Sequence, residues 1–232
     1  MKEALTLLTL LLLSPFKALP AEDRKSDSPN VLIYGATPAG ISAALTAAKR
    51  GSSVLLVEPY STIGGLMTNG LSHSDFRTFE GLTGAFLDHT KRIDEYYVDR
   101  YGADSPQAKE TFRGTHAEPH VNVAVFEASL AEHPGITVLR RARLLKVQLD
   151  EKDRTRIKSV SLESKEDRWM EVEAAVFIDA SYEGDLMARA GVPYAVGREA
   201  RAAYGESLAP KTADGQLQGY NFRLIMTQRP EL

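Results

Sequence analysis

The sequence contains no cysteine among its 232 residues. This absence excludes structural disulfides, redox dithiols, iron–sulfur ligation and thiolate zinc sites. A large charge excess is also missing: the net charge is −3 at pH 7, so the chain is not basic enough to predict a partner nucleic acid. The histidines and acids show no metal-ligand spacing. Any redox chemistry must therefore come from a bound organic cofactor.

The remaining composition, 43% hydrophobic and 25% charged, is that of a globular chain with one sizeable core. An apolar run from Ala4 to Leu13, followed by Ala18-Leu19-Pro20-Ala21, predicts a signal peptide over residues 1–21. The run is too short for a stable membrane span, and we expect an exported protein. The alternative is an unprocessed or misassigned N-terminal extension. Residues 22–29 are polar and are expected to form a linker.

Two short apolar runs with a helical segment between them predict a β-turn-α-β unit. Val31–Tyr34 lies between Asn30 and Gly35 and is typical of a buried parallel strand. Val54–Val57 forms the second strand, which Glu58 closes. The separation, 58 − 35 = 23 residues, is near the spacing at which a dinucleotide fold places an acid on the ribose hydroxyls.

The turn between these elements, Gly35-Ala36-Thr37-Pro38-Ala39-Gly40, predicts a helix start. Thr37 is a suitable N-cap and Pro38 a suitable first residue of a helix that runs to Arg50 and stops at Gly51. Amides at this start can bind a pyrophosphate. Thr37 replaces the middle glycine of G-x-G-x-x-G, so the phosphate would be contacted past a side chain, with help from its hydroxyl. The alternative is a tight βα turn in another α/β fold.

A segment rich in glycine, Ser61 to Leu71, follows Glu58 directly. Gly64 and Gly65 permit close approach of the backbone to a ligand. We expect this loop to run back along the same cofactor; a flexible surface loop is the alternative.

The central part of the chain is predicted to be helical. The first helix spans Thr83 to Tyr101, and Gly102 stops it. A connecting loop is expected from Ser105-Pro106 to Gly114. A second helix starts at Pro119 and ends before Pro134-Gly135.

From Ile136 the apolar period changes to two, which predicts half-exposed strands of an antiparallel meander. The expected strands are Ile136–Leu139, Leu145–Leu149, Ile157–Leu162 and Trp169–Val172. The continuously apolar run Ala174–Ile178 is expected to return to the buried parallel sheet. A last strand is predicted at Asn221–Thr227.

At five separated places the sequence resembles the bacterial FAD-dependent oxidoreductase family, whose FAD domain belongs to the glutathione-reductase class. The motifs are the turn GATPAG, the acid in LLVEP, the loop IGGLMTNGL, the segment EPHV and the stretch FIDASYEGDLMARAGVPYAVGRE. They occur in the family's order and cover most of Val31 to Thr227.

The resemblance implies an α/β fold with a Rossmann-like FAD-binding domain, an antiparallel meander insertion and the start of a second domain. It places the ADP part of FAD at the first turn and Glu58, the pyrophosphate and ribityl chain along the glycine loop, and the adenine at the backbone of Leu144. Tyr182 replaces the glycine of the family's Ala-Thr-Gly strand end. The residues expected to bind the cofactor are Gly35, Thr37, Pro38, Ala39, Gly40, Glu58, Gly64, Gly65, Leu66, Leu144, Ala180 and Ser181.

The implied activity is hydride transfer from a small organic substrate to FAD. We assign residues 30–197 to the FAD-binding domain and 198–232 to an incomplete substrate domain, because the family continues beyond the NFRLIMT strand. A truncated or split protein is expected, with a C-terminal complementing segment as a partner. The alternatives are a non-catalytic remnant or binding module and an NAD-dependent dehydrogenase.

The catalytic base stays unassigned. His73 and His120 are placed to approach a flavin, whereas His89 and His133 are expected at the surface and His116 in a loop. Each of these imidazoles is also suited to bracing a loop by a hydrogen bond.

Overall fold

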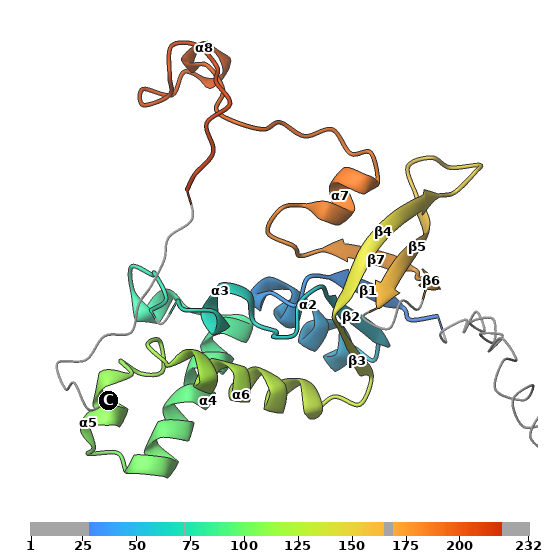
Figure 1. Cartoon of the computed structure of the whole chain (residues 1–232). Helices are drawn as coiled ribbons and strands as arrows, with labels where there is room; N and C mark the ends of the chain where they lie inside the picture. The colour runs from blue at the N-terminus through green and yellow to red at the C-terminus, as the bar shows by residue number, and fades with distance from the viewer. Residues whose placement is uncertain (1–27, 72, 165–168, 220–232) are drawn as a thin grey trace, which may run out of the picture.

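The computed structural model describes residues 28–71, 73–164 and 169–219 (Figure 1). The predicted signal peptide, most of the linker and the predicted strand Asn221–Thr227 lie outside the described residues.

Four parallel strands form the central sheet, in the order β3-β2-β1-β7. Their bounds are β1 Val31–Tyr34, β2 Val54–Glu58, β3 Ile136–Arg140 and β7 Val176–Asp179. Both strands of the predicted β-turn-α-β unit are confirmed, and every residue of β1 and β2 is buried. The fold is the expected α/β class.

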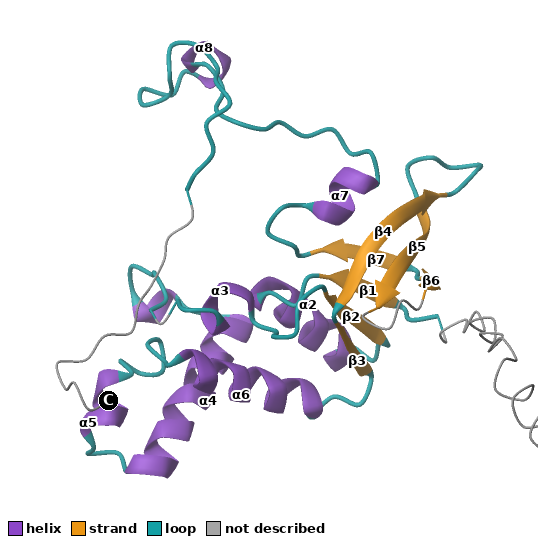
Figure 2. Cartoon of the chain, in the orientation of Figure 1, coloured by secondary structure: helices purple, strands orange, loops and turns teal. Residues whose placement is uncertain are grey.

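Helices cover one face of this sheet (Figure 2). They are α2 (Pro38–Lys49), α6 (Pro119–Ala131) and, packed on both, α4 (Gly84–Tyr101). The core between helices and sheet includes Ile33 and Leu56 from the strands and Ile41 and Phe126 from the helices. Full burial of one such side chain contributes about 1.5–3 kcal/mol to the stability of the fold, so this layer stabilises the packing of α2 on the sheet.

The other face is covered by a three-stranded antiparallel sheet in the order β4-β5-β6. These strands are β4 Ala142–Leu149, β5 Ile157–Ser164 and β6 Trp169–Glu173. The alternate residues of the central strands, such as Leu32 and Val57, pack against Leu144 and Leu162 of this sheet. The predicted meander is therefore a separate layer on the central sheet.

The placement of Ile136–Leu139 in the meander is wrong. This segment is β3, which pairs in parallel with β2 at the edge of the central sheet. It follows helix α6, and a strand reached by a helical crossover returns parallel. Arg141, with φ +56, separates β3 from β4. That left-handed residue turns the chain out of one sheet and into the other.

Two predicted loops contain short helices. The segment after Ser105 forms α5 (Pro106–Glu110), because Ser105 Oγ accepts a hydrogen bond from Ala108 N at 3.1 Å. A serine N-cap followed by proline is a helix-start pattern, and expecting a loop there was wrong. The glycine-rich segment includes one helical turn, α3 (Gly65–Thr68). The remaining short helices are η1 Phe79–Gly81, α7 Asp185–Arg189 and α8 Arg201–Tyr204.

Strand β7 returns to the central sheet in parallel beside β1, as predicted. It is less buried than its apolar sequence suggested, because Val176 is 50% exposed. Among the described strands β7 has one neighbour in the sheet, which accounts for this exposure. The segment that carries α8 stands away from the sheet in Figure 1.

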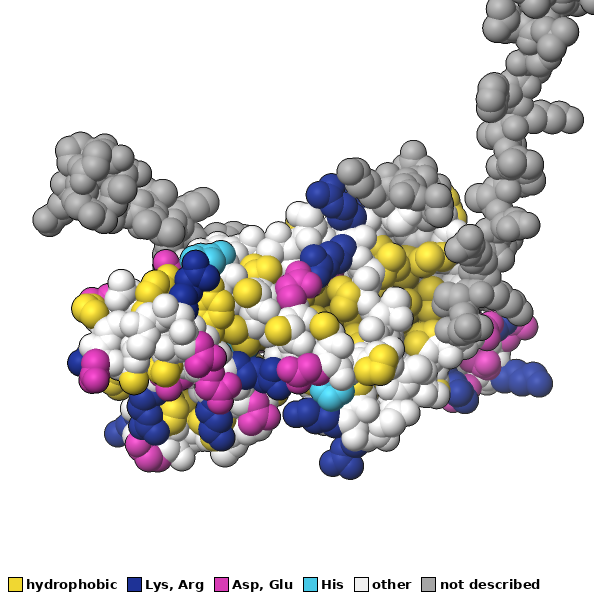
Figure 3. Space-filling model, turned by 90° about the horizontal axis from the view of Figure 1, so that it is seen from below, with side chains coloured by type: hydrophobic (Ala, Val, Ile, Leu, Met, Phe, Trp, Pro, Cys, Tyr) yellow, Lys and Arg dark blue, Asp and Glu magenta, His cyan; other side chains and the backbone are white. Residues whose placement is uncertain are grey.

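Basic and acidic side chains are interspersed over the face drawn in Figure 3. In the part of the chain that the structure describes, no helix has the length and apolar character needed to cross a membrane.

Candidate cofactor-binding site

The candidate site lies at the carboxyl edge of the central sheet, between β1 and β7. The chain leaves β1 toward β2 on one side and returns to its other side as β7. In open parallel sheets such a switch of direction opens a crevice for ligands. Gly35 follows β1 with φ +99, and a Cβ there would lie 2.7 Å from the carbonyl carbon of Ala180. Glycine therefore allows the two strand ends to touch.

Thr37 fixes the turn that follows. Its Oγ1 donates to the carbonyl oxygen of Ala180 at 2.8 Å and accepts from Gly40 N at 3.3 Å. The N-cap role is confirmed, but the hydroxyl hydrogen that was expected to help hold a phosphate is directed at Ala180 instead. Gly40 packs so tightly that a Cβ would lie 2.0 Å from the Gly35 carbonyl oxygen. Ala39, in the first turn of α2, is exposed.

Glu58 is a buried acid at the end of β2, with 5% of its surface exposed. Its Oε2 accepts from Ala36 N and its Oε1 from Tyr60 N, each at 2.9 Å. Burial raises the pKa of Glu58, while these two hydrogen bonds and the charge of Arg140 oppose the rise. Each carboxylate oxygen has a further lone pair, so the group is oriented to accept two more donors.

The start of α3 lies opposite Ser181 and Tyr182. Gly64 and Gly65 have φ +94 and +53, and a Cβ on Gly65 would lie 2.3 Å from the hydroxyl oxygen of Tyr182. Leu66 N donates to that hydroxyl oxygen at 2.8 Å. The tyrosine therefore joins the end of β7 to the glycine-rich segment where a glycine would leave them apart.

Asp179 holds the loop that carries Tyr182. Its Oδ1 accepts from Ser181 N at 3.0 Å and from Ser181 Oγ at 2.7 Å, and its Oδ2 accepts from Met187 N at 2.8 Å. One carboxylate thus ties the end of β7 to the first turn of α7.

Leu144 lies where β4 crosses the edge of the central sheet. Its amide donates to the hydroxyl of Tyr34 at 3.3 Å, and its side chain is buried. The pairing of β4 with β5 shifts register between Leu144 and Lys146. This bulge bends the strand at the cavity.

These elements enclose a cavity of about 710 Å³. Seven predicted residues line it, namely Gly35, Thr37, Glu58, Gly65, Leu66, Leu144 and Ser181. The other five, Pro38, Ala39, Gly40, Gly64 and Ala180, adjoin them in the chain without lining the cavity. Lining residues that sequence reasoning missed include Tyr34, Tyr60, Asn69, Arg143, Glu163, Asp185 and Arg189. They come from the end of β1, from loops, from the meander and from α7, where no short motif marks a ligand contact.

The residues present fit the adenosine diphosphate part of a dinucleotide cofactor. A buried, pre-oriented carboxylate suits ribose hydroxyls, and the glycine-lined crevice beside α2 leaves room for a close pyrophosphate. The volume is within the usual range for cofactor cavities. Arg189 donates to Asp185 Oδ1 at 2.7 Å, so one of the two lining arginines is already paired.

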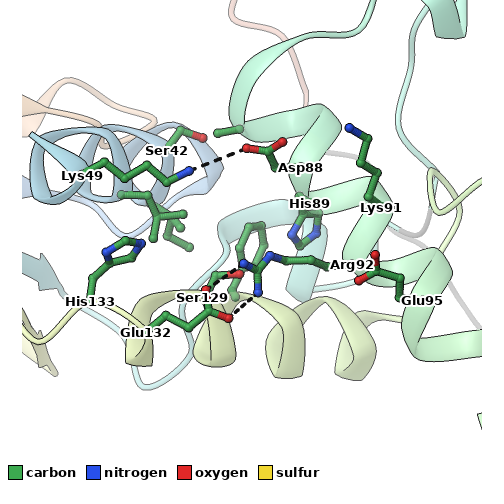
Figure 4. A pocket seen from close by; sticks show the side chains of 14 residues that line it. Ser42, Lys49, Asp88, His89, Lys91, Arg92, Glu95, Ser129, Glu132 and His133 are labelled. Carbon is green, nitrogen blue, oxygen red and sulfur yellow. Dashed lines mark hydrogen bonds and ion pairs between the residues drawn. The ribbon is translucent and has the colours of Figure 1, made fainter. Parts of the chain in front are cut away.

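A second cavity, of about 510 Å³, lies among α2, α4 and α6, away from the carboxyl edge (Figure 4). Arg92 forms a two-pronged ion pair with Glu132, at 2.6 and 2.7 Å. His89 was expected at the surface, and that expectation is wrong. It is buried, its Nε2 lies 2.9 Å from Asn122 Oδ1, and its ring stacks on Phe126. His89 is therefore a core residue, and its burial lowers its pKa.

A third cavity, of about 480 Å³, is lined by His73 and His116. Their ring centroids are 4.1 Å apart, and burial together with His73 lowers the pKa of His116. At its wall Tyr97 donates to Glu118 Oε2 at 2.5 Å. His120 is exposed on α6. Among the described residues, no group of three His, Asp or Glu could hold a metal ion.

Comparison with known proteins identifies the class. Residues 30–232 match a family model described as FAD dependent oxidoreductase. The chain belongs to this family. A comparison with curated proteins gives no match.

Solved structures resemble the chain at low identity. OxyS anhydrotetracycline hydroxylase from Streptomyces rimosus is similar with a TM-score of 0.50 and 14% identity, over 75% of this chain and 35% of that one. Glycerol-3-phosphate dehydrogenase from Bacillus halodurans, complexed with FAD, has a TM-score of 0.48 and 12% identity, over 73% of this chain and 38% of that one. Glycine oxidase from Geobacillus kaustophilus has a TM-score of 0.43 and 15% identity, over 71% of this chain and 59% of that one. This chain therefore spans less than two thirds of each of these proteins.

Proposed function

We propose that the chain binds FAD in the 710 Å³ cavity and serves a flavoenzyme that oxidises a small organic substrate. Glu58 carries this proposal, because its buried carboxylate is held by Ala36 N and Tyr60 N and faces the cavity. Family membership supports FAD over NAD as the cofactor. Bound FAD would supply a hydride acceptor, and the protein supplies orientation and electrostatics.

The described residues divide the binding task. Glu58 would accept hydrogen bonds from the ribose hydroxyls, and the crevice formed by Gly35 and the start of α2 would hold the pyrophosphate. Gly64 and Gly65 would lie along the pyrophosphate and ribityl chain, and Leu144 would contact the adenine through its backbone. Each of these contacts orients the cofactor along the carboxyl edge without taking part in the chemical step.

Flavin content tests the proposal. The purified chain, mixed with excess FAD and passed over a gel-filtration column, should keep the yellow absorption of the flavin, whereas NAD should wash off. Glu58→Ala should retain less FAD than Glu58→Gln, because charge-assisted hydrogen bonds contribute about 1.5–3 kcal/mol and the amide keeps one acceptor.

The matched control is Glu173→Ala, which removes an exposed acid at the end of β6. Its flavin content should equal that of the wild type. Equal flavin in all four proteins would remove Glu58 from the site, and a colourless wild type would refute FAD binding by this chain.

We further propose that a complementing polypeptide segment covers the last described part of the chain. Leu208 is 98% exposed, Leu217 71% and Tyr204 75%, and Val176 is half exposed on β7. Apolar side chains as exposed as these favour association. Light scattering on the isolated chain should detect self-association, and a strictly monomeric, monodisperse protein would contradict this.

We also propose that residues 1–21 direct export of the protein. Fractionation of expressing cells, with N-terminal sequencing of the product, tests this.

A further inference from the structure

Tyr182 occupies the place where the resembling family has a glycine, and it does more there than fill space. Its hydroxyl oxygen accepts a hydrogen bond from Leu66 N at 2.8 Å. Its ring lies directly on Gly65, where a Cβ would come within 2.3 Å of the hydroxyl oxygen. Both sides of this contact line the 710 Å³ cavity. The hydroxyl therefore stands at the cavity wall in a fixed position.

The hydroxyl keeps a hydrogen to donate. A tyrosine hydroxyl carries one donor and also accepts, and the Leu66 amide uses only the accepting side. Among residues 28–71, 73–164 and 169–219, no acceptor for the Tyr182 hydroxyl hydrogen is found. Burial raises the pKa of Tyr182, so the group stays protonated at neutral pH.

The charged residues that line the cavity around Tyr182 determine which ligand groups its hydroxyl can contact. Glu58, Glu163, Glu183 and Asp185 line the cavity, against Arg143 and an Arg189 that is paired with Asp185. An anionic ligand in such a cavity meets few free cations, so neutral donors must hold its charge. A donor polarised by an amide behind it is stronger than an isolated one.

We propose that the Tyr182 hydroxyl donates a hydrogen bond to the pyrophosphate of FAD, with Leu66 N–H behind it. Tyr182 is thus a cofactor-positioning residue. The inference rests on the proposed function, because it takes FAD as the ligand of this cavity. The loop is rigid enough for this role, since Asp179 binds Ser181 and Met187 on either side of Tyr182.

The experiment compares FAD dissociation from the full chain in four forms: wild type, Tyr182→Phe, Tyr182→Gly and the control Tyr204→Phe. Tyr204 is 75% exposed on α8 and does not line the cavity. Release rates are followed by the recovery of flavin fluorescence, and the two phosphorus resonances of bound FAD are recorded by NMR. Circular dichroism checks that each variant is folded.

Loss of a hydrogen bond to a charged group should speed release by about ten- to a hundredfold in Tyr182→Phe. At least one phosphorus resonance should shift, while Tyr204→Phe behaves as wild type. Tyr182→Gly should release FAD at least as fast as Tyr182→Phe, because it also removes the ring that covers Gly65.

Wild-type release and spectra in Tyr182→Phe or in Tyr182→Gly would overturn the inference and leave FAD binding standing. Faster release with unchanged phosphorus resonances would overturn it too, since the hydroxyl would then act only by holding Leu66. A wild type without FAD affinity would instead refute the proposed function, and this inference with it.

Discussion

Thr37 Oγ1 donates to the carbonyl oxygen of Ala180 at 2.8 Å, across 143 positions of the chain. The first residue of the pair caps α2 and the second follows β7, so one hydroxyl joins the two parts of the sheet edge at which we propose the cofactor site. The bond is possible because Gly35 has no Cβ to hold the strand ends apart.

Thr37→Ala should lower the free energy of unfolding by about 2–3 kcal/mol, since it removes both the helix cap and the donor to Ala180. Thr37→Ser keeps the hydroxyl and should stay within about 1 kcal/mol of wild type. Urea denaturation measures both. Ser105→Ala removes the cap of α5, with its bond from Ala108 N, and a local bond to the carbonyl oxygen of Gly102; it serves as a control with an expected loss of about 1 kcal/mol. Equal losses in Thr37→Ala and Ser105→Ala would show that the long-range bond to Ala180 stabilises the fold no more than the local bond to Gly102 does.

Gly40→Ala should destabilise the protein by about 3 kcal/mol or more, although alanine usually favours a helix. The added Cβ would lie 2.0 Å from the backbone oxygen of Gly35, which cannot move without opening the turn. Gly135→Ala is the matched control, because its nearest neighbour, Ser52 O, is 3.6 Å away. Gly135→Ala should change the unfolding free energy by less than about 0.5 kcal/mol. Similar midpoints for the two variants in urea would contradict the packing argument.

Local signals predicted much of this fold. Thr37-Pro38 gave the start of α2, Pro119 the start of α6, and the apolar runs gave β1, β2 and β7. These features depend on residues that are neighbours in the chain, so they can be predicted from a single sequence. The same reasoning missed that β3 pairs with β2, because Ile136–Leu139 alternates like a meander strand and only the preceding crossover settles its partner.

Residues of the candidate site could be predicted where a short motif contains them, but not where tertiary packing brings them together. Glu58 follows from its spacing after Gly35, but its bonds to Ala36 N and Tyr60 N depend on how the turn folds back. The burial of His89 was missed because it depends on Asn122 and Phe126 of another helix. No local pattern reveals such partners.

FAD affinity should fall on acidification as pH drops through the raised pKa of Glu58, by up to about tenfold per pH unit below it. Ribose hydroxyls donate to the ionised carboxylate, and burial makes protonation of Glu58 occur above its ordinary value of 4.5. The effect on stability has the opposite sign: the folded state binds the proton more readily, so stability falls as pH rises from 4.5 through the raised pKa. Fluorescence titrations with FAD between about pH 5 and 8 measure the affinity. Glu58→Gln should bind weakly at all these pH values, and a wild-type slope in that variant would assign the titration to another group.

The buried imidazole of His89 predicts a second pH dependence. Burial lowers its pKa below the ordinary value of 6.5, and the charge of Arg92 adds to this while the bond to Asn122 opposes it. Between the lowered value and 6.5 the unfolded chain binds the proton and the folded chain does not, so stability must fall as pH drops through that window.

The slope is limited to about 1.4 kcal/mol per pH unit for one group, and His116, whose pKa is also lowered, adds a share of its own. His89→Phe keeps the stacking on Phe126 and should reduce the slope between about pH 7.5 and 5.5 in urea denaturation. The His89→Phe substitution should also lower the free energy of unfolding by about 1–3 kcal/mol at every pH, because Asn122 Oδ1 loses its donor. His120→Gln, at an exposed position of α6, should leave both slope and stability unchanged. An unchanged slope in His89→Phe would show that His89 does not cause this pH dependence.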